Sequence, residues 1–261
     1  MKLAKAAARA ILPEFLFYRI AAVRSRRFQL KALRREGLLD AAASYVERNG
    51  CIVRFGPFTG MIYPRDAALS RHSIPKLLGT YEQELHPVLD TIAHRRYDLV
   101  IDIGSAEGYY AVGLARLLGT HVLAYDPEPI ERSYCREAAR LNGVESLVEL
   151  NGLFRPTRIR QLIGQRILCV CDCEGFEAEI FNAETVKEVA NWDLLIELHG
   201  EAAGKLTSLP WPHRLTSIAS TPRTGNYPEL EGLGGQGKLL SEFRGEAQTW
   251  LWCDSVTVGQ Q

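Results

Sequence analysis

Four ionisable residues follow two apolar runs in the second half of the chain, and they are residue types that can move a proton. The four are Asp172, Glu174, Glu197 and His199. Side chains alternate between the two faces of a strand, so the pair ending the run 167–173 shares one face, as does the pair ending the run 192–198. If the two strands are neighbours, the groups meet at one sheet edge and supply a base with orienting carboxylates. A single histidine at a strand end is more often structural, so the cluster carries the prediction of catalysis.

Three cysteines alternate along the first of these runs. Cys169, Cys171 and Cys173 would lie in a flat row, which holds the sulfurs too far apart for one tetrahedral zinc ion, so we interpret them as small buried apolar residues. Asp172, Glu174 or His199 could bind a divalent metal, but a site without metal is the favoured interpretation.

A glycine-containing turn earlier in the chain has the composition of a ligand-binding loop. The apolar run 98–103 contains Asp102, and Gly104 and Gly108 follow it at the start of a helical pattern. A strand, a glycine turn and a helix together present backbone N–H groups to a ligand, although such a turn can also need glycine for folding alone. The fingerprint of dinucleotide-binding proteins requires a further glycine where this chain has Ala106, which disfavours a dinucleotide.

Asp126 lies 22 positions after Gly104, at the end of the next apolar run. An acidic residue about 20 positions after such a turn can accept hydrogen bonds from both ribose hydroxyls. A residue that caps the following helix is the alternative, and the two roles are compatible. Together, the turn and Asp126 predict a nucleoside site.

Strand and helix patterns alternate from Tyr97 onward. Strands are expected at 98–103, 121–125, 147–150, 167–173, 192–198, 214–220 and 249–253, and helices at 106–118, 128–142 and 176–190. Near-continuous apolar strands indicate burial on both faces, so the prediction is an α/β fold with a doubly wound, mostly parallel, seven-stranded sheet. The glycine-rich segment 224–238 resists assignment and is either a connector or a lid over the ligand.

The first 96 residues precede this sheet. We expect a basic helical arm over 1–50 that stops at Asn49-Gly50, then a hairpin and a lead-in helix over 51–96, with Thr80 as its cap, before the catalytic domain at 97–261. Residues 1–35 carry ten Lys/Arg against one acid. The arm packs on the domain or on another subunit, as in a homo-oligomer, or it contacts an anionic membrane as a peripheral anchor.

Composition limits the partners and the compartment. The chain has 261 residues, with 31 basic and 31 acidic side chains, so overall charge does not favour nucleic acid. Six cysteines without a disulfide pattern predict a cytoplasmic location, although Arg-rich, acid-poor beginnings also occur in organellar transit peptides. No run of about 18 apolar residues predicts a transmembrane helix.

Four motifs taken together resemble the FkbM-type family of S-adenosylmethionine-dependent methyltransferases. The matching segments are 100–110, 124–129, 172–177 and 196–199, within a region of resemblance over about 80–200. The chain departs from the family at Gly104-Ser105-Ala106, where Gly-Ala-Asn is common, and so loses an amide side chain near the cofactor.

The resemblance implies methyl transfer from S-adenosylmethionine to a hydroxyl of a small molecule or glycan. It places the cofactor against Glu82, Asp102, Gly104, Ser105, Gly108, Tyr109 and Asp126. Asp172 or His199 would be the base, and Glu174 and Glu197 would orient the acceptor. Two alternatives are an oxidoreductase that uses NAD, disfavoured by Ala106, and a non-catalytic methyltransferase-like scaffold whose basic arm recruits partners.

Overall fold

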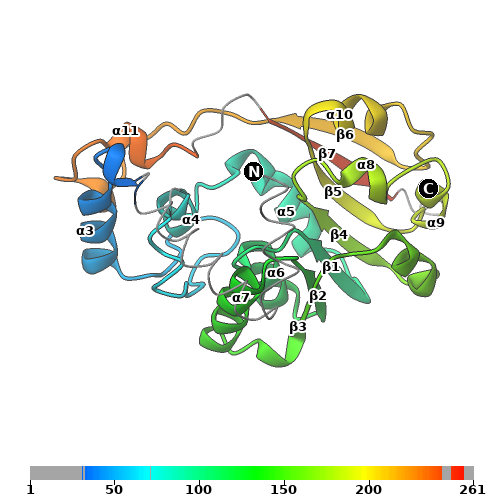
Figure 1. The fold of residues 1–261 in the computed structure, drawn as a ribbon, viewed down its shortest axis with the longest axis horizontal. Coiled ribbons are helices and arrows are strands. Elements are labelled where there is room, and N and C mark those ends of the chain that lie inside the picture. The colour runs from blue at the N-terminus through cyan, green and yellow to red at the C-terminus, as the bar shows by residue number, and fades with distance from the viewer. Residues whose placement is uncertain (1–30, 32, 71, 243–247, 256–261) are drawn as a thin grey trace, which may run out of the picture.

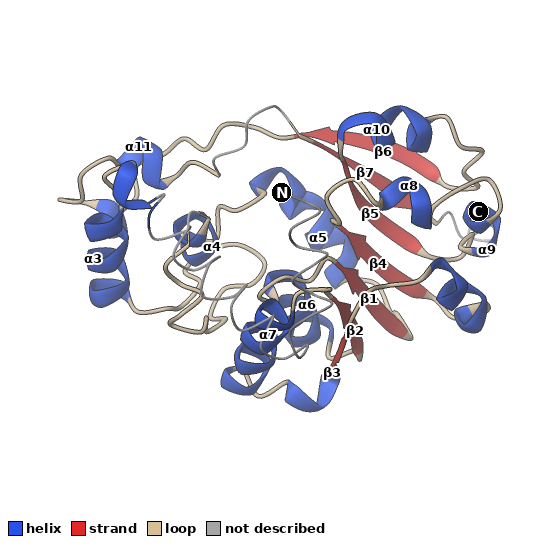
Figure 2. Ribbon diagram, viewed as in Figure 1, coloured by secondary structure: helices blue, strands red, loops and turns tan. Residues whose placement is uncertain are grey.

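A twisted sheet of seven strands forms the centre of the molecule in the computed structural model, which describes residues 31, 33–70, 72–242 and 248–255 (Figures 1 and 2). In space the strand order is β3-β2-β1-β4-β5-β7-β6. The strands are β1 (Leu99–Ile103), β2 (Val122–Tyr125), β3 (Val148–Asn151), β4 (Ile167–Cys171), β5 (Asp193–Leu198), β6 (Arg214–Ala219) and β7 (Thr249–Asp254). The first five pair in parallel, and β7 runs antiparallel to β5 and β6. The predicted fold class is confirmed.

Helices cover both faces of this sheet. They are α5 (His86–Ala93), α6 (Tyr109–Leu118) and α7 (Pro129–Leu141) on one face, and α8 (Glu177–Ile180), α9 (Thr185–Glu188) and α10 (Gly200–Thr207) on the other (Figure 1). Alternate residues of β1 and β4 therefore enter two separate apolar clusters, with Val100 and Leu168 in one and Ile101 and Cys169 in the other. Burial on both sides explains why these strands are apolar throughout.

The chain reverses its direction of travel across the sheet at β1. Strand β2 lies on one side of β1 and β4 on the other, and the pairs Ile103–Cys171 and Cys171–Ile196 align the carboxyl ends of β1, β4 and β5. Loops leaving these ends diverge, which is where open α/β sheets bind their ligands.

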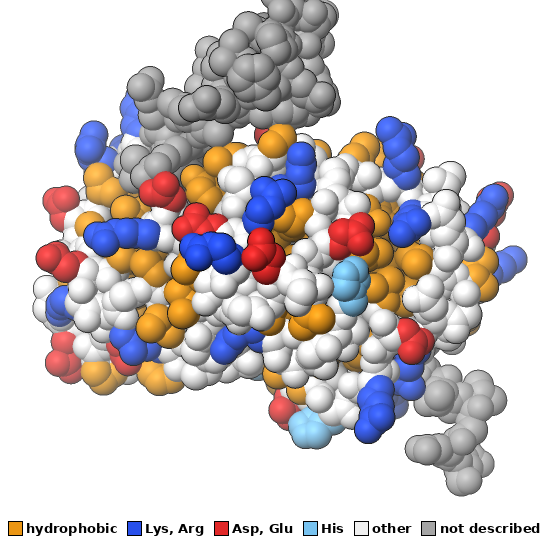
Figure 3. Space-filling view, turned by 90° about the horizontal axis from the view of Figure 1, so that it is seen from below, with side chains coloured by type: hydrophobic (Ala, Val, Ile, Leu, Met, Phe, Trp, Pro, Cys, Tyr) orange, Lys and Arg blue, Asp and Glu red, His pale blue; other side chains and the backbone are white. Residues whose placement is uncertain are grey.

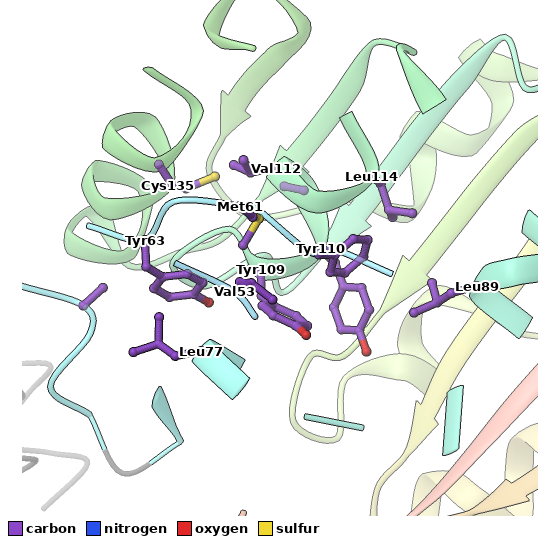
Figure 4. Packing of buried hydrophobic residues seen from close by; sticks show 14 of the residues in the cluster. Val53, Met61, Tyr63, Leu77, Leu89, Tyr109, Tyr110, Val112, Leu114 and Cys135 are labelled. Atoms are coloured by element: carbon purple, nitrogen blue, oxygen red, sulfur yellow. The ribbon is translucent and has the colours of Figure 1, made fainter. Parts of the chain in front are cut away.

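The N-terminal part of the described chain contains α3 (Leu39–Asn49) and α4 (Ser73–Leu78). Val53, Met61 and Leu77 lie against the buried start of α6 (Figure 4), whereas α3 lies farther out, beside the segment 224–238 (Figure 1). Helix α3 stops at the predicted position, because Gly50 adopts φ 72° there. Residues 1–30 and 32, most of the predicted basic arm, lie outside the described residues.

The predicted hairpin over 51–64 is present as a short antiparallel pair. Ile52 and Ile62 form its bridge, and the backbone N–H groups of Val53 and Tyr63 donate to the carbonyls of Met61 and Cys51. The pairing goes no further, because the N–H groups of Arg54 and Phe55 donate to α4 at Leu77 and Leu78. Helix α4 itself has no counterpart in the prediction.

Two helices also differ from expectation. Thr80 caps nothing, since its hydroxyl lies 3.5 Å from the Pro75 carbonyl, and a 3-10 turn, η1 (Gln83–Leu85), comes before α5. The helix expected at 176–190 is broken into α8 and α9, because the Asn182 side chain accepts the Thr185 N–H and starts a new turn.

The remaining short helices lie in connections. They are η2 (Glu145–Leu147), η3 (Pro156–Leu162), η4 (Pro228–Leu230) and α11 (Gln236–Leu239). The last two belong to the glycine-rich segment 224–238, which lies beside α3 (Figure 1). Arg48 and Asn49 donate to the carbonyls of Glu231 and Glu229, and Leu230 is buried in the same cluster as α3. The segment is a packed connection to α3.

The surface seen from below mixes basic, acidic and apolar side chains (Figure 3). Within the described ranges, the helices are all too short or too polar to cross a bilayer.

Candidate active site

A cavity of about 370 Å³ opens at the carboxyl ends of β1 and β4. Its walls come from residues 66–70 and His72, Lys76 of α4, the turn 104–107, the first turns of α6 and α7, and the residues after β4. The segment 224–238 contributes no lining residue, so it is not a lid over this cavity. The cavity occupies the place where the sheet topology predicts a ligand.

The two glycines of the turn are required by close packing. Gly104 has φ 87°, and a Cβ atom there would lie 1.6 Å from the Asp172 carbonyl oxygen. Gly108 has φ 94°, and a Cβ atom there would lie 2.7 Å from Cys135 Sγ. The folding explanation for these glycines is therefore sufficient, and evidence for a ligand must come from the side chains around them.

Asp102 and Ser105 supply that evidence. Asp102 is 2% exposed and Ser105 4%, and both line the cavity. Among the described residues, Asp102 Oδ2 and Ser105 Oγ have no hydrogen-bond partner. Burial, followed by the nearby carboxylates of Asp172 and Asp126, raises the pKa of Asp102 to about 8. An unpaired buried carboxyl oxygen is costly, and a donor or a cation entering the cavity would relieve that cost.

Asp126 ties the glycine turn to the start of α7. Its Oδ2 accepts the Ala106 N–H at 3.0 Å and its Oδ1 accepts the Glu128 N–H at 2.7 Å. Asp126 lies outside the cavity lining, and burial raises the pKa of its carboxyl. Each oxygen keeps a lone pair, so the anchoring role leaves room for a further donor.

Glu82 lies behind the cavity wall. It is 1% exposed, holds φ 49°, and accepts a hydrogen bond from the hydroxyl of Tyr110. Tyr110 and Tyr109 line the cavity and lie side by side at the start of α6 (Figure 4). Tyr109 packs edge-on against the ring of Tyr81, at 5.3 Å between centroids, so this wall is aromatic and rigid.

The structure brings the four strand-end groups together, with the three carboxylates around the ring of His199. Nε2 of His199 lies 3.6 Å from Glu197 Oε2, 3.7 Å from Asp172 Oδ1 and 3.9 Å from Glu174 Oε2. Nδ1 lies 3.0 Å from Oε1 of Glu177, which is fully buried. Glu177 therefore fixes the orientation of the imidazole, and Nε2 faces three carboxylates.

This arrangement suits a general base. The hydrogen bond that His199 donates to Glu177 raises the pKa of His199, and Asp172 adds to the effect, because a positive imidazolium is stabilised by the carboxylates around it. Oxygen and nitrogen atoms of Asp172, Glu174 and His199 lie within 4.8 Å of one another and could also hold a divalent cation. Cys169 and Cys171 are buried in the apolar cluster beneath, as predicted. Cys173 is only half-buried, and its Sγ lies 3.7 Å from that of Cys171, closer than the predicted flat row implies.

Four further charged residues belong to the site and were not singled out by sequence reasoning. They are Lys76, Glu107, Glu131 and Glu177. Lys76 forms an ion pair with Glu107, which also accepts a hydrogen bond from Tyr63 at 2.9 Å. Burial, with Glu107 and Asp126 nearby, raises the pKa of Glu131 to about 7. Glu107 lies inside the glycine turn, and that place in the motif was the available signal for it; Lys76 had none.

Among the comparisons with known proteins, only the search of solved structures finds proteins similar to this chain. No family model matches the sequence, and no curated protein matches it. An rRNA methylase from Streptococcus thermophilus has a TM-score of 0.45 and 14% identity, over 66% of this chain and 96% of that one. The O-methyltransferase TomG from Streptomyces achromogenes, solved with SAM, has a TM-score of 0.45 and 12% identity, over 70% of this chain and 87% of that one. A human methyltransferase 10 domain containing protein has a TM-score of 0.40 and 15% identity, over 66% of this chain and 81% of that one.

Proposed function

We propose that the protein is an S-adenosylmethionine-dependent methyltransferase that methylates a hydroxyl group of a small molecule or glycan. The observation that carries the proposal is the charge of the cavity. Its acidic lining residues are Asp66, Asp102, Glu107, Glu131, Asp172 and Glu174. Of the described side chains in the lining, Lys76 is the one lysine or arginine. S-adenosylmethionine carries a sulfonium and an α-ammonium group, and such a lining attracts both.

The same charge disfavours NAD. A pyrophosphate group would meet several carboxylates, and the cavity lining offers it one cation that already pairs with Glu107. The backbone N–H of Ala106, which a phosphate could otherwise use, donates to Asp126. An oxidoreductase therefore lacks the anion site that its cofactor needs.

Methyl transfer needs a nucleophilic oxygen in line with the methyl carbon of the donor, and the donor supplies that carbon on a positively charged sulfur. His199 Nε2 would take the proton of the acceptor hydroxyl, and Glu177, at 3.0 Å from Nδ1, would hold the ring in position. Asp172 and Glu197 would stabilise the imidazolium that forms. Asp102, beside the glycine turn, would face the positive end of the donor.

The resemblance of the four motifs to the FkbM-type family supports oxygen as the acceptor atom. It also supports a role for Asp126 in binding the donor's ribose. A scaffold without catalysis would have little reason to keep this cluster, in which buried Glu177 holds the His199 ring and three further carboxylates lie near its Nε2. Burying such charges is costly.

Isothermal titration calorimetry with S-adenosylhomocysteine and NADH tests the proposal. We expect the wild-type protein to bind S-adenosylhomocysteine and not NADH. Asp126→Ala should weaken that binding at least about tenfold, as loss of hydrogen bonds to a charged group does. Asp90→Asn, an exposed acid on α5, is the matched control and should bind normally. Absence of S-adenosylhomocysteine binding to the wild-type chain, or binding of NADH, would refute the proposal.

A further inference from the structure

Two cysteine sulfurs lie in contact where the chain leaves β4. Sγ of Cys171 and Sγ of Cys173 are 3.7 Å apart. Side chains two positions apart on a regular strand are separated by about 6.6 Å, so the backbone must leave the strand geometry here. It does so because β4 ends at Cys171, and the N–H groups of Cys173 and Gly175 both donate to Oε1 of Glu177, at 3.1 Å each. The turn after β4 therefore brings together two thiols that a flat strand would keep apart.

The two thiols differ in their exposure to solvent. Cys171 is fully buried, whereas Cys173 is half-buried. The hydrogen bond with Cys173, followed by burial, raises the pKa of the Cys171 thiol well above its usual range, so Cys171 keeps its proton. Cys51 is the other half-buried cysteine, and burial raises the pKa of its thiol as well. Cys173 thus combines access for a small oxidant with a second sulfur in contact.

The pair is close to the geometry of a disulfide. A disulfide needs the two sulfurs to approach from 3.7 Å to about 2.0 Å. Cα atoms two positions apart are separated by at most about 7 Å, near the upper end of the range that disulfides span. We propose that Cys171 and Cys173 form a redox-active dithiol, which a hydroperoxide converts to a disulfide that spans Asp172.

The oxidation has two balanced steps. The Cys173 thiolate attacks one oxygen of the hydroperoxide, so that an S–O bond forms, the O–O bond breaks, and the other oxygen leaves with the proton that Cys173 gave up. The Cys171 sulfur then attacks the Cys173 sulfur, so that the S–S bond forms, the S–O bond breaks, and hydroxide leaves as water with the Cys171 proton. The two thiols lose two electrons and the peroxide gains them. A dithiol reductant reverses the change.

Asp172, between the two cysteines, connects the pair to the candidate active site. Its carbonyl oxygen packs so closely on Gly104 that a Cβ atom there would lie 1.6 Å away. Its N–H donates to the Ile103 carbonyl at 2.9 Å, and its Oδ1 lies 3.7 Å from His199 Nε2. A disulfide closes a small ring around the backbone of Asp172, so the sulfurs cannot approach without moving that residue. Oxidation therefore disturbs both the glycine turn and the histidine cluster.

Mass spectrometry of the full-length protein tests the modification. After treatment with hydrogen peroxide, the wild-type segment 167–187 should lose two hydrogen atoms, and dithiothreitol should restore them. Cys173→Ser should form no disulfide. In Cys171→Ala, the sulfenic acid on Cys173 has no second thiol to react with and should be trapped by dimedone. Cys51→Ser, at the other half-buried cysteine, is the matched control and should be oxidised as the wild type is.

Amide hydrogen exchange tests the link to the site. The N–H groups of Asp172 and Gly104 donate to the carbonyls of Ile103 and Tyr125 in the reduced protein. In the oxidised wild type, both should exchange at least about tenfold faster. This comparison needs no variant, so it decides the question even if a substitution impairs folding. It also needs no methyl donor, so its result does not depend on the proposed function.

Two sets of results would overturn the proposal. Peroxide treatment that leaves the pair reduced, that places the disulfide elsewhere, or that still forms it in Cys173→Ser would refute the dithiol. A disulfide between Cys171 and Cys173 with unchanged exchange at Asp172 and Gly104 would refute its effect on the site.

Discussion

Replacing Gly104 by alanine should strongly destabilise the protein, and the structure gives the size of the effect. The new Cβ would lie 1.6 Å from the Asp172 carbonyl oxygen, so the two backbones must separate by at least about 1.8 Å to reach the 3.4 Å of an ordinary contact. That shift breaks the hydrogen bond from the Asp172 N–H to the Ile103 carbonyl, now 2.9 Å. Three effects lower the free energy of unfolding: positive φ by about 1–2 kcal/mol, overpacking by about 1–3 kcal/mol and the lost hydrogen bond by about 1 kcal/mol.

We therefore expect Gly104→Ala to lower the free energy of unfolding by about 3–6 kcal/mol, a large part of the 5–15 kcal/mol that is typical of a domain. Gly119→Ala is the matched control. Gly119 also has positive φ, at 62°, but a Cβ atom there contacts nothing within 4 Å, so the cost should be about 1–2 kcal/mol. Urea unfolding followed by tryptophan fluorescence measures both. Equal losses in the two variants would refute the argument that β1 and β4 meet at Gly104.

Two further predictions concern the histidine cluster and the packing of α6. The hydrogen bond that His199 donates to Glu177 raises the pKa of His199 above 6.5. The stability advantage of the wild type over His199→Gln should therefore be full below about pH 6.5 and disappear as pH rises through the folded-state pKa. Urea unfolding across this range checks it, and an advantage that grows with pH would contradict it. Gly113→Ala should destabilise by about 1–3 kcal/mol, because its Cβ would lie 2.6 Å from the ring of Phe58, whereas Gly204→Ala, with open space around it, should be neutral or stabilise by up to about 1 kcal/mol in thermal unfolding. The same sign for both glycine variants would exclude this account.

The sequence was informative where local pattern and global fold agree. Strands such as Leu99–Ile103 are apolar at nearly every position because helices cover both faces, and that pattern is readable without a structure. Helix α4 was not readable in this way, because Ser73–Leu78 contains a proline and is too short to show a helical period. Its burial comes from contacts with residues distant in the chain, which no local pattern encodes.

The site divides in the same way. Alternation in β4 and β5 predicted that Asp172 and His199 would share an edge, and the strand order brings them to 3.7 Å between Oδ1 and Nε2. Glu177 ends the motif 172–177, but its contact with His199 could not be predicted from spacing, because α8 is one turn long and its position depends on where the loop after β4 folds back. Lys76 and Glu107 are 31 residues apart, and their ion pair depends on how the N-terminal segment packs on α6.

The carboxyl groups that line the cavity affect both the stability of the fold and the affinity for a cationic ligand. Burial and like charges raise the pKa of Asp102 to about 8 and that of Glu131 to about 7, so without a ligand Asp102 is mostly protonated and Glu131 about half protonated at pH 7. A cationic ligand favours the ionised forms, and its arrival must release those protons. The affinity for such a ligand consequently increases as pH rises toward 8. The unpaired carboxyl of Asp102, which weakens the fold at the end of β1, would thus also favour a positively charged ligand over a neutral or anionic one.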